Sequence, residues 1–105
     1  MTQNISSEKN NDNEIQNALA MLSSAVRQYL DDFARTRGYD NIIAAVTYST
    51  SSVDQFSKEG RYAIEARDST WLIANNILDH VENNNRHIPS IKELYELLPV
   101  LQWPE

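Results

Sequence analysis

The sequence has no cysteine, only two glycines, and no apolar stretch of the length that a membrane-spanning helix requires. Without cysteine the chain forms no disulfide bond and offers no thiolate nucleophile or cysteine-ligated metal. Its first fourteen residues have neither the basic start nor the apolar core of a secretory signal. We therefore expect no membrane partner, and a protein that stays in the cytoplasm unless assembly or lysis releases it.

Positive charge is also scarce, because nine Lys and Arg residues stand against fifteen Asp and Glu residues, for a net charge of −6. Such a balance repels phosphate backbones, so nucleic acid is not an expected partner. The most basic stretch carries Arg27, Arg35 and Arg37, but Asp31 and Asp32 lie among them. This mixture is typical of a solvated helix face with ion pairs four residues apart.

Groups that could support catalysis or hold a cofactor are few. Gly38 and Gly60 lie 22 residues apart, so they cannot form a glycine-rich phosphate loop. His80 and His87 lack the further ligands that a metal site needs. Carboxylate pairs occur, but no base or nucleophile accompanies them. The sequence predicts no catalytic residue, no metal and no cofactor, and therefore a protein that is not an enzyme.

The length of 105 residues suits one domain, which can bury roughly 60 to 68% of its unfolded surface. Residues 1–12 are polar and show no hydrophobic periodicity, which predicts a flexible N-terminal arm. Asn13 followed by Gln16 resembles a helix N-cap with its box partner. We expect a single helical domain over residues 13–105.

The first predicted helix carries one apolar stripe. Its members recur at spacings of three and four residues: Ile15, Leu19, Leu22, Val26, Tyr29 and Phe33. Gly38 suits the left-handed position after the helix, with Tyr39 folding back on Phe33 or Ala34. The stripe has fewer than three full heptads, which favours a core-facing helix. A coiled-coil seam, and with it a homo-oligomer, stays open as the alternative.

A short apolar block follows at residues 42–46. A strand here would have no partner strand in the chain, so a short second helix begun by Asp40 or Asn41 is the better prediction. The hydroxyl-rich residues after it predict a linker whose last member, Ser52, caps the next helix. That third helix should run from about residue 53 to 82, with a break or bend near Gly60. Its wide apolar face is typical of the central helix of a bundle.

Arg67 falls in the same predicted row as Ala74 and Val81, which should face the core. A buried unpaired charge costs several kcal/mol, so Arg67 should snorkel outward or meet a carboxylate on another segment. Asp31, Asp40 and Glu59 are the candidate carboxylates, since Asp68 should point elsewhere on the helix. The alternative is that Arg67 clamps an anion or a substrate. Trp71, among alanines and isoleucines, is predicted to be core.

The C-terminal part predicts a last short helix and an extended tail. Ser90 and Glu93 form a capping box before an apolar run that stops at Pro99. The tail beyond it carries three apolar residues predicted to dock on a partner: Val100, Leu101 and Trp103. In the alternative, Trp103 folds back onto the helices. The predicted fold is all-α, a small bundle of three to four helices with a disordered N-terminal arm and an extended C-terminal tail.

Three stretches, RGYDNIIAAVTYSTSS, FSKEGRYAIEARDSTW and IPSIKELYELLPVLQWP, resemble the layout of small proteins encoded among the tail genes of tailed bacteriophages and prophages. The resemblance covers about residues 36 to 104. Its signature positions are the hydroxyl turn of residues 49–52 together with Tyr39, Asp40, Glu59, Gly60, Ala66, Arg67, Asp68, Trp71, Leu98, Pro99, Leu101, Trp103 and Pro104. The resemblance implies a virion or assembly context and brings no catalytic residues.

The expected function is that of a structural or adaptor protein of a phage tail or tail fibre, which docks on a larger tail or fibre protein. Such a protein would occur in the host cytoplasm during assembly and, as a structural part, in the virion tail. One alternative is an assembly chaperone that is absent from the mature particle. Another is a host-directed inhibitor that mimics nucleic acid, but that function needs acidic residues gathered on one face, whereas here arginines are interspersed among them.

Overall fold

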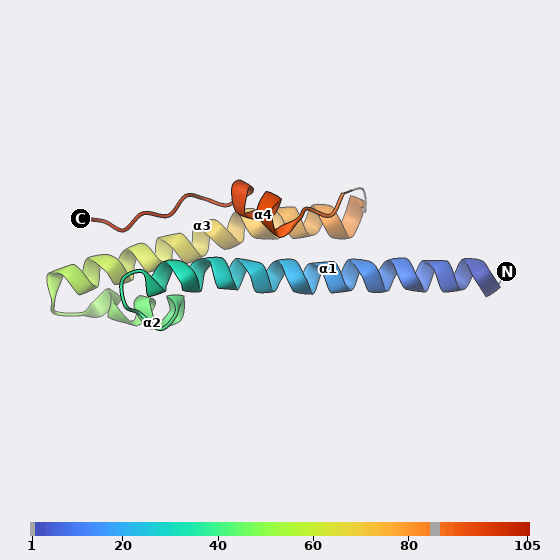
Figure 1. Cartoon of the computed structure of the whole chain (residues 1–105). Coiled ribbons are helices and arrows are strands. Elements are labelled where there is room, and N and C mark those ends of the chain that lie inside the picture. The colour runs from blue at the N-terminus through green and yellow to red at the C-terminus, as the bar shows by residue number, and fades with distance from the viewer. Residues whose placement is uncertain (1, 85–86) are drawn as a thin grey trace.

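The protein is a small all-α bundle with an extended C-terminal segment (Figure 1). The computed structural model describes residues 2–84 and 87–105, with side chains described over residues 13–83 and 87–105. Within these ranges there is no β-strand. The elements are four α-helices and one 3-10 helix: α1 (Thr2–Arg35), α2 (Ile42–Val46), η1 (Thr47–Thr50), α3 (Asp54–Asn84) and α4 (Ile91–Leu97).

Helix α1 begins at Thr2, twelve residues before Glu14, the residue that follows the predicted N-cap. Asn13 therefore lies inside the helix, and its predicted role as N-cap is wrong. Figure 1 shows the N-terminal part of α1 continuing past the ends of the other helices. The side chains of residues 1–12 lie outside the described part of the chain, and the flexibility of this arm stays a prediction.

The end of α1 matches its prediction in detail. Gly38 has a φ of +86°, the left-handed conformation that glycine adopts without steric cost. The Gly38 N–H donates to the Arg35 carbonyl at 3.0 Å, and the Tyr39 N–H donates to the Ala34 carbonyl at 3.3 Å. These two hydrogen bonds define a Schellman motif. The motif turns the chain so that Tyr39 packs against the cluster that contains Ala34 and Phe33.

The apolar block after this turn is the short helix α2, as predicted. Asn41 caps it, because the Asn41 side chain accepts a hydrogen bond from the Ala44 N–H at 2.8 Å. Asp31 of α1 accepts a second one from the Ile42 N–H at 3.0 Å, which ties the start of α2 to α1. The hydroxyl-rich residues that were predicted to form a linker instead begin with the 3-10 helix η1.

Helix α3 is continuous through Gly60, so the predicted break or bend there is wrong. Gly60 is buried against η1. A Cβ atom at this position would lie 2.6 Å from Ser49 Cα and 2.5 Å from the Tyr48 carbonyl carbon, and it would also clash with the Ser49 nitrogen. The glycine therefore allows two backbones to touch, which a side chain of any size would prevent.

Helix α4 has the predicted capping box. The Glu93 N–H donates to the Ser90 hydroxyl at 3.1 Å, and the Ser90 N–H donates to the Glu93 carboxylate at 3.1 Å. The hydrogen bond that the Glu93 carboxylate accepts from the Ser90 N–H is the main cause that lowers the pKa of Glu93, and a hydrogen bond with His87 lowers it further. The helix ends at Leu97, before Pro99, as expected.

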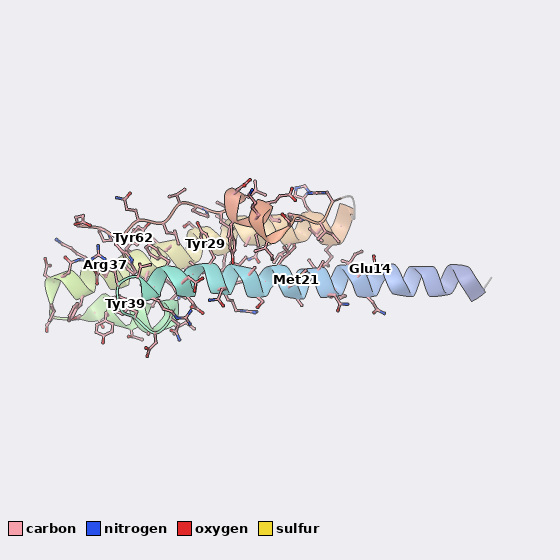
Figure 2. All side chains as sticks on the ribbon, viewed as in Figure 1. Glu14, Met21, Tyr29, Arg37, Tyr39 and Tyr62 are labelled. Atoms are coloured by element: carbon pink, nitrogen blue, oxygen red, sulfur yellow. The ribbon has the colours of Figure 1, made fainter. Side chains whose placement is uncertain are left out.

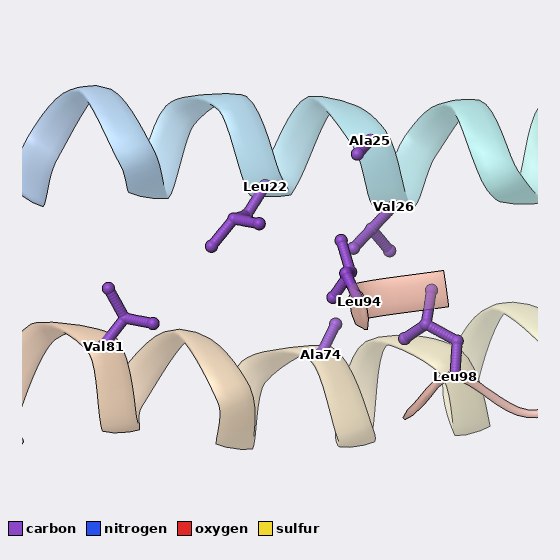
Figure 3. Close-up of a cluster of buried hydrophobic side chains, with 7 residues drawn as sticks. All are labelled: Leu22, Ala25, Val26, Ala74, Val81, Leu94 and Leu98. Carbon is purple, nitrogen blue, oxygen red and sulfur yellow. The ribbon is translucent and has the colours of Figure 1, made fainter. Parts of the chain in front are cut away.

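The buried side chains form two clusters along the α1–α3 pair. The first joins α1, α3 and α4, and Figure 3 shows its members: Leu22, Ala25, Val26, Ala74, Val81, Leu94 and Leu98. The second joins α1, α2, α3 and the C-terminal segment: Leu30, Ala34, Ile42, Ala45, Ala63, Ala66 and Trp103. Burial of these apolar surfaces supplies the main driving force for folding. None of the helices in the described ranges combines the length and apolar character needed to cross a membrane.

Candidate functional site

A charged network lies just beyond the C-terminal end of α1, where Figure 2 labels Arg37 and Tyr39. Both residues contact the buried carboxylate of Glu59 on α3. Arg37 Nη1 donates to Glu59 Oε2 at 2.6 Å, and the Tyr39 hydroxyl donates to Glu59 Oε1 at 2.7 Å. Gln55 Nε2 donates to Glu59 Oε2 at 3.0 Å from one turn earlier on α3. Both carboxylate oxygens are therefore paired, as a buried charge requires.

These contacts shift two pKa values in opposite directions. Burial alone would raise the pKa of Glu59, but the hydrogen bonds from Gln55, Tyr39 and Arg37 and the charge of Arg37 together hold it below its usual value. Burial, the hydrogen bond to Glu59 and its negative charge raise the pKa of Tyr39 to about 12. Both shifts keep the network in one protonation state, an ionised Glu59 with a neutral Tyr39, across the neutral range.

Trp103 folds back into the second cluster beside this network, so it is not an exposed docking residue. Its ring is stacked on Phe33 with centroids 4.3 Å apart, and only 7% of its surface is exposed. Its indole N–H donates to the Thr36 hydroxyl at 2.9 Å, and the Arg37 guanidinium lies 5.8 Å from the ring centroid. The fold-back alternative is the one that the structure supports.

The rest of the C-terminal segment is held by hydrogen bonds to α1 and α3. The Tyr29 hydroxyl donates to the Pro99 carbonyl at 2.6 Å, and the Gln102 N–H donates to the Tyr62 hydroxyl at 3.0 Å. Leu101 is half-buried against the second cluster. Val100 is the one member of the predicted docking set that is open to solvent, with 92% of its surface exposed.

Arg67 does not form the predicted bridge between segments. Its guanidinium pairs with Asp68, the adjacent residue, at 3.0 Å, and 42% of the Arg67 side chain is exposed. Ala74 and Val81, in the same row, are buried as predicted. The long arginine side chain reaches solvent from a core-facing position, so the expectation that it locks neighbouring segments together is wrong.

Arg67 and Trp71 instead line an open groove between α1, α2 and α3. The groove has a volume of about 200 Å³, and its wall is formed by Arg27, Leu30, Asp31, Ile42, Ile43, Arg67 and Trp71. Ile43 stands at the groove with 69% of its surface exposed. Trp71 is half-buried and also packs against both core clusters, so it has one side in the core and one toward the groove.

The groove combines apolar walls with two guanidinium groups. Arg27 makes no ion pair or hydrogen bond with any residue that the structure describes. The Asp31 carboxylate is already engaged by the Ile42 N–H. No nucleophile faces a base in the wall, and no group of three or more His, Asp or Glu side chains suited to a metal gathers in the described part of the chain. The arrangement suits binding of a group that is partly apolar and partly anionic.

The predicted signature residues do not converge on one site. Tyr39 belongs to the Glu59 network, and Gly60 forms the contact with η1. Arg67 and Trp71 line the groove, and Asp68 pairs with Arg67 beside it. Asp40 is exposed, and its backbone carbonyl accepts a hydrogen bond from Arg35 Nε at 3.0 Å.

The inter-segment ion pair that the sequence predicted for Arg67 exists between Arg37 and Glu59 instead. A signal for Glu59 is present in the sequence, because Glu59 stands at helical spacing ahead of Ala63, Ala66 and Thr70, all of which are buried. A carboxylate in a core row needs a cation from another segment. Arg37 comes just before the Schellman glycine, so the turn positions it, but periodicity alone does not point to it.

Comparisons with the sequence profiles of protein families, with curated protein sequences and with solved structures found no match.

Proposed function

We propose that this protein is a non-enzymatic adaptor that docks on a larger protein, and that its context is the tail or tail fibre of a bacteriophage. The observation that carries the docking role is the groove between α1, α2 and α3, with Ile43 largely exposed at its wall. Exposed large apolar side chains beside a concave surface are typical of protein interaction sites. The phage context rests on the sequence resemblance alone.

Further exposed apolar side chains favour docking over catalysis. Leu72 and Leu97 are 69% and 57% exposed, and Val100 is 92% exposed. They lie on α3, on α4 and in the C-terminal segment. An interaction protein uses such side chains directly, whereas an enzyme needs polar groups that converge on a reacting atom.

Mass analysis of purified phage particles tests the proposal. A structural adaptor should be present in fixed stoichiometry with the tail proteins, and a strain that produces the Ile43→Asp variant should yield particles that lack it. Met21→Asp is the matched control, because Met21 is an exposed apolar residue of α1 that lies outside the groove. A protein that is needed for tail assembly yet absent from particles is the chaperone alternative. A deletion strain that assembles infectious particles normally would overturn both.

A further inference from the structure

We propose that the groove between α1, α2 and α3 binds a protein segment in which one large apolar side chain lies next to an acidic side chain. This inference rests on the docking function proposed above and specifies the partner. It follows from the size of the groove, the character of its walls and the state of its two arginines.

The size of the groove selects one side chain. The groove has a volume of about 200 Å³. This volume lies below the roughly 300 Å³ at which small-molecule and cofactor sites begin. One Leu, Phe or Trp side chain fills such a space, whereas a helix or a nucleotide does not fit. The occupant therefore contributes a single anchor from a longer chain, in the manner of interface hot spots.

The walls of the groove favour an apolar anchor. Ile43, which is largely exposed, and the half-buried indole of Trp71 present its accessible apolar surface, and the buried Leu30 and Ile42 lie beneath. Water in contact with Ile43 and Trp71 is released when an apolar side chain covers them, which favours binding. A bare phosphate or sulfate would bring no apolar surface to cover these walls.

The two arginines favour a carboxylate beside that anchor. Arg27 has no carboxylate partner among the described residues, and the partner of Arg67 is the neighbouring exposed Asp68, an arrangement that contributes little. The wall thus presents two guanidinium groups against the single carboxylate of Asp31, in a chain whose net charge is −6. Guanidinium groups bind carboxylates through paired hydrogen bonds, so an incoming acidic side chain gains a partner that Asp68 does not fully occupy.

The chain's own acidic and apolar C-terminus is not the occupant. Trp103 is buried in the second cluster, and Glu105 pairs with Arg37 at 3.3 Å, away from the groove. None of the side chains that the structure describes fills the groove, so we infer that the ligand comes from another chain.

The test uses the full ¹⁵N-labelled chain and two pools of acetylated, amidated octapeptides. In the first pool each peptide has one Leu, Phe or Trp beside one Asp or Glu, and in the matched pool the acid is replaced by Asn or Gln. We expect the acidic pool to shift the backbone amide signals of residues 27–31, 42–43 and 67–71. The best acidic peptide should bind at least tenfold more tightly than its amide counterpart.

Three single variants locate the contact. Arg27→Gln and Arg67→Gln should each weaken the best acidic peptide severalfold and leave its amide counterpart unchanged. Arg61→Gln is the control, because Arg61 is an exposed arginine of α3 that lies outside the groove. All three positions are exposed or half-exposed, so the variants should fold, and circular dichroism checks this.

Several outcomes would overturn this inference without contradicting the adaptor function, which the analysis of phage particles tests separately. These are equal binding of the two pools, binding that the Arg27 and Arg67 variants do not alter, and shifts outside the groove. Sodium phosphate producing the same shifts would identify a simple anion site instead. Shifts at the groove that depend on protein concentration without peptide would identify a second copy of this chain as the occupant.

Discussion

Glu59 is the one buried carboxylate among the side chains that the structure describes, and each of its neighbours contributes to keeping it charged. Arg37, Tyr39 and Gln55 supply three donors to its two oxygens. A buried carboxylate without them would cost several kcal/mol. The ionised Glu59 therefore connects the turn after α1 to the first turns of α3. It can stay charged only while the donors from that turn remain in place.

The pKa shifts of this network predict how stability depends on pH. Because the pKa of Glu59 is lower in the folded protein, its contribution is present above the usual carboxyl pKa of 4.5 and is lost as the pH falls through the folded value. Because the pKa of Tyr39 is raised to about 12, its contribution is present below pH 10 and is lost as the pH rises toward 12.

Urea unfolding across the pH range, with tyrosine absorbance followed at high pH, measures both effects. The Glu59→Gln variant should have a shallower loss of stability in acid than the unaltered protein. The Tyr39→Phe variant should lack the highest tyrosine titration. If every tyrosine ionises near pH 10 in the folded protein, the hydrogen bond between Tyr39 and Glu59 is not present in solution.

Arg37 and Arg67 should differ in their effect on stability. Arg37→Met leaves the buried Glu59 without its cation and should reduce the free energy of unfolding by about 2 kcal/mol or more. Arg67→Met removes an exposed pair with a sequence neighbour and should change it by less than about 1 kcal/mol. Urea unfolding compares the two, and equal losses would contradict the assignment of the ion pairs.

Sequence periodicity located the Arg67 backbone correctly and its charged group incorrectly. The row that holds Ala74 and Val81 does face the core, but a periodic pattern specifies where a Cα–Cβ bond points. A guanidinium at the end of a long side chain can lie elsewhere. Trp71 was predicted as core for the same reason, and its half-buried ring shows that a core-facing row can also border a groove.

At the scale of the elements, the helix ends were predictable because their hydrogen bonds are local. The Schellman turn at Gly38 and the capping box at Ser90 each involve residues within five positions of one another. The role of Gly60 was not predictable in this way. A glycine inside a helix suggests weakness from its propensity, whereas its function here depends on η1, a segment that approaches it only after folding.

The Gly60→Ala substitution tests this contact. Alanine should favour the helix by about 1 kcal/mol over glycine. The clash of its methyl group with the backbone of η1 should outweigh that gain, for a net loss of about 2 kcal/mol or more. Gly38→Ala is the comparison, because it meets no atom within 4 Å and costs only the strain of its positive φ, about 1 kcal/mol. Urea unfolding of both variants shows which one loses more free energy of unfolding. A Gly60→Ala protein that is more stable than the unaltered protein would disprove the close approach of Gly60 to the η1 backbone.

The C-terminal segment provides a second test at this scale. Trp103→Ala should lower the free energy of unfolding by about 3 to 5 kcal/mol, because it empties the space between Phe33 and the other aromatic rings. Val100→Ala, three residues earlier, should change it by less than about 0.5 kcal/mol, since Val100 is exposed. Thermal unfolding followed by circular dichroism compares the stability of the two variants. A Trp103→Ala protein with an unchanged melting temperature would show that Trp103 is not part of the core and would favour the docking role instead.

The whole molecule is a rod, and its shape follows from two long helices that pack side by side. Its principal extents are 65 × 19 × 18 Å, and its termini lie at opposite ends (Figure 1). The Cα radius of gyration is 17.6 Å, whereas a compact domain of this length has a value of about 13 Å. The sequence predicted a bundle but not this elongation, because the periodic pattern of α1 starts well after the helix does.

Small-angle X-ray scattering measures the elongation directly. A monomer should give a radius of gyration near 17.6 Å that does not change on dilution. A value near 13 Å would show that α1 does not extend past the bundle in solution. A value that grows with concentration would favour the homo-oligomer that the stripe on α1 left open.

The contact between Gly60 and η1 also limits how related sequences can diverge. Any descendant that acquires a side chain at position 60 must move the backbone near Tyr48 and Ser49 at the same time, through an insertion or a different turn. Changes at position 60 and in the η1 turn should therefore be correlated among related sequences. A glycine paired with an unchanged spacing of eleven residues back to the η1 turn would then serve as a marker of common ancestry even after most other positions have changed.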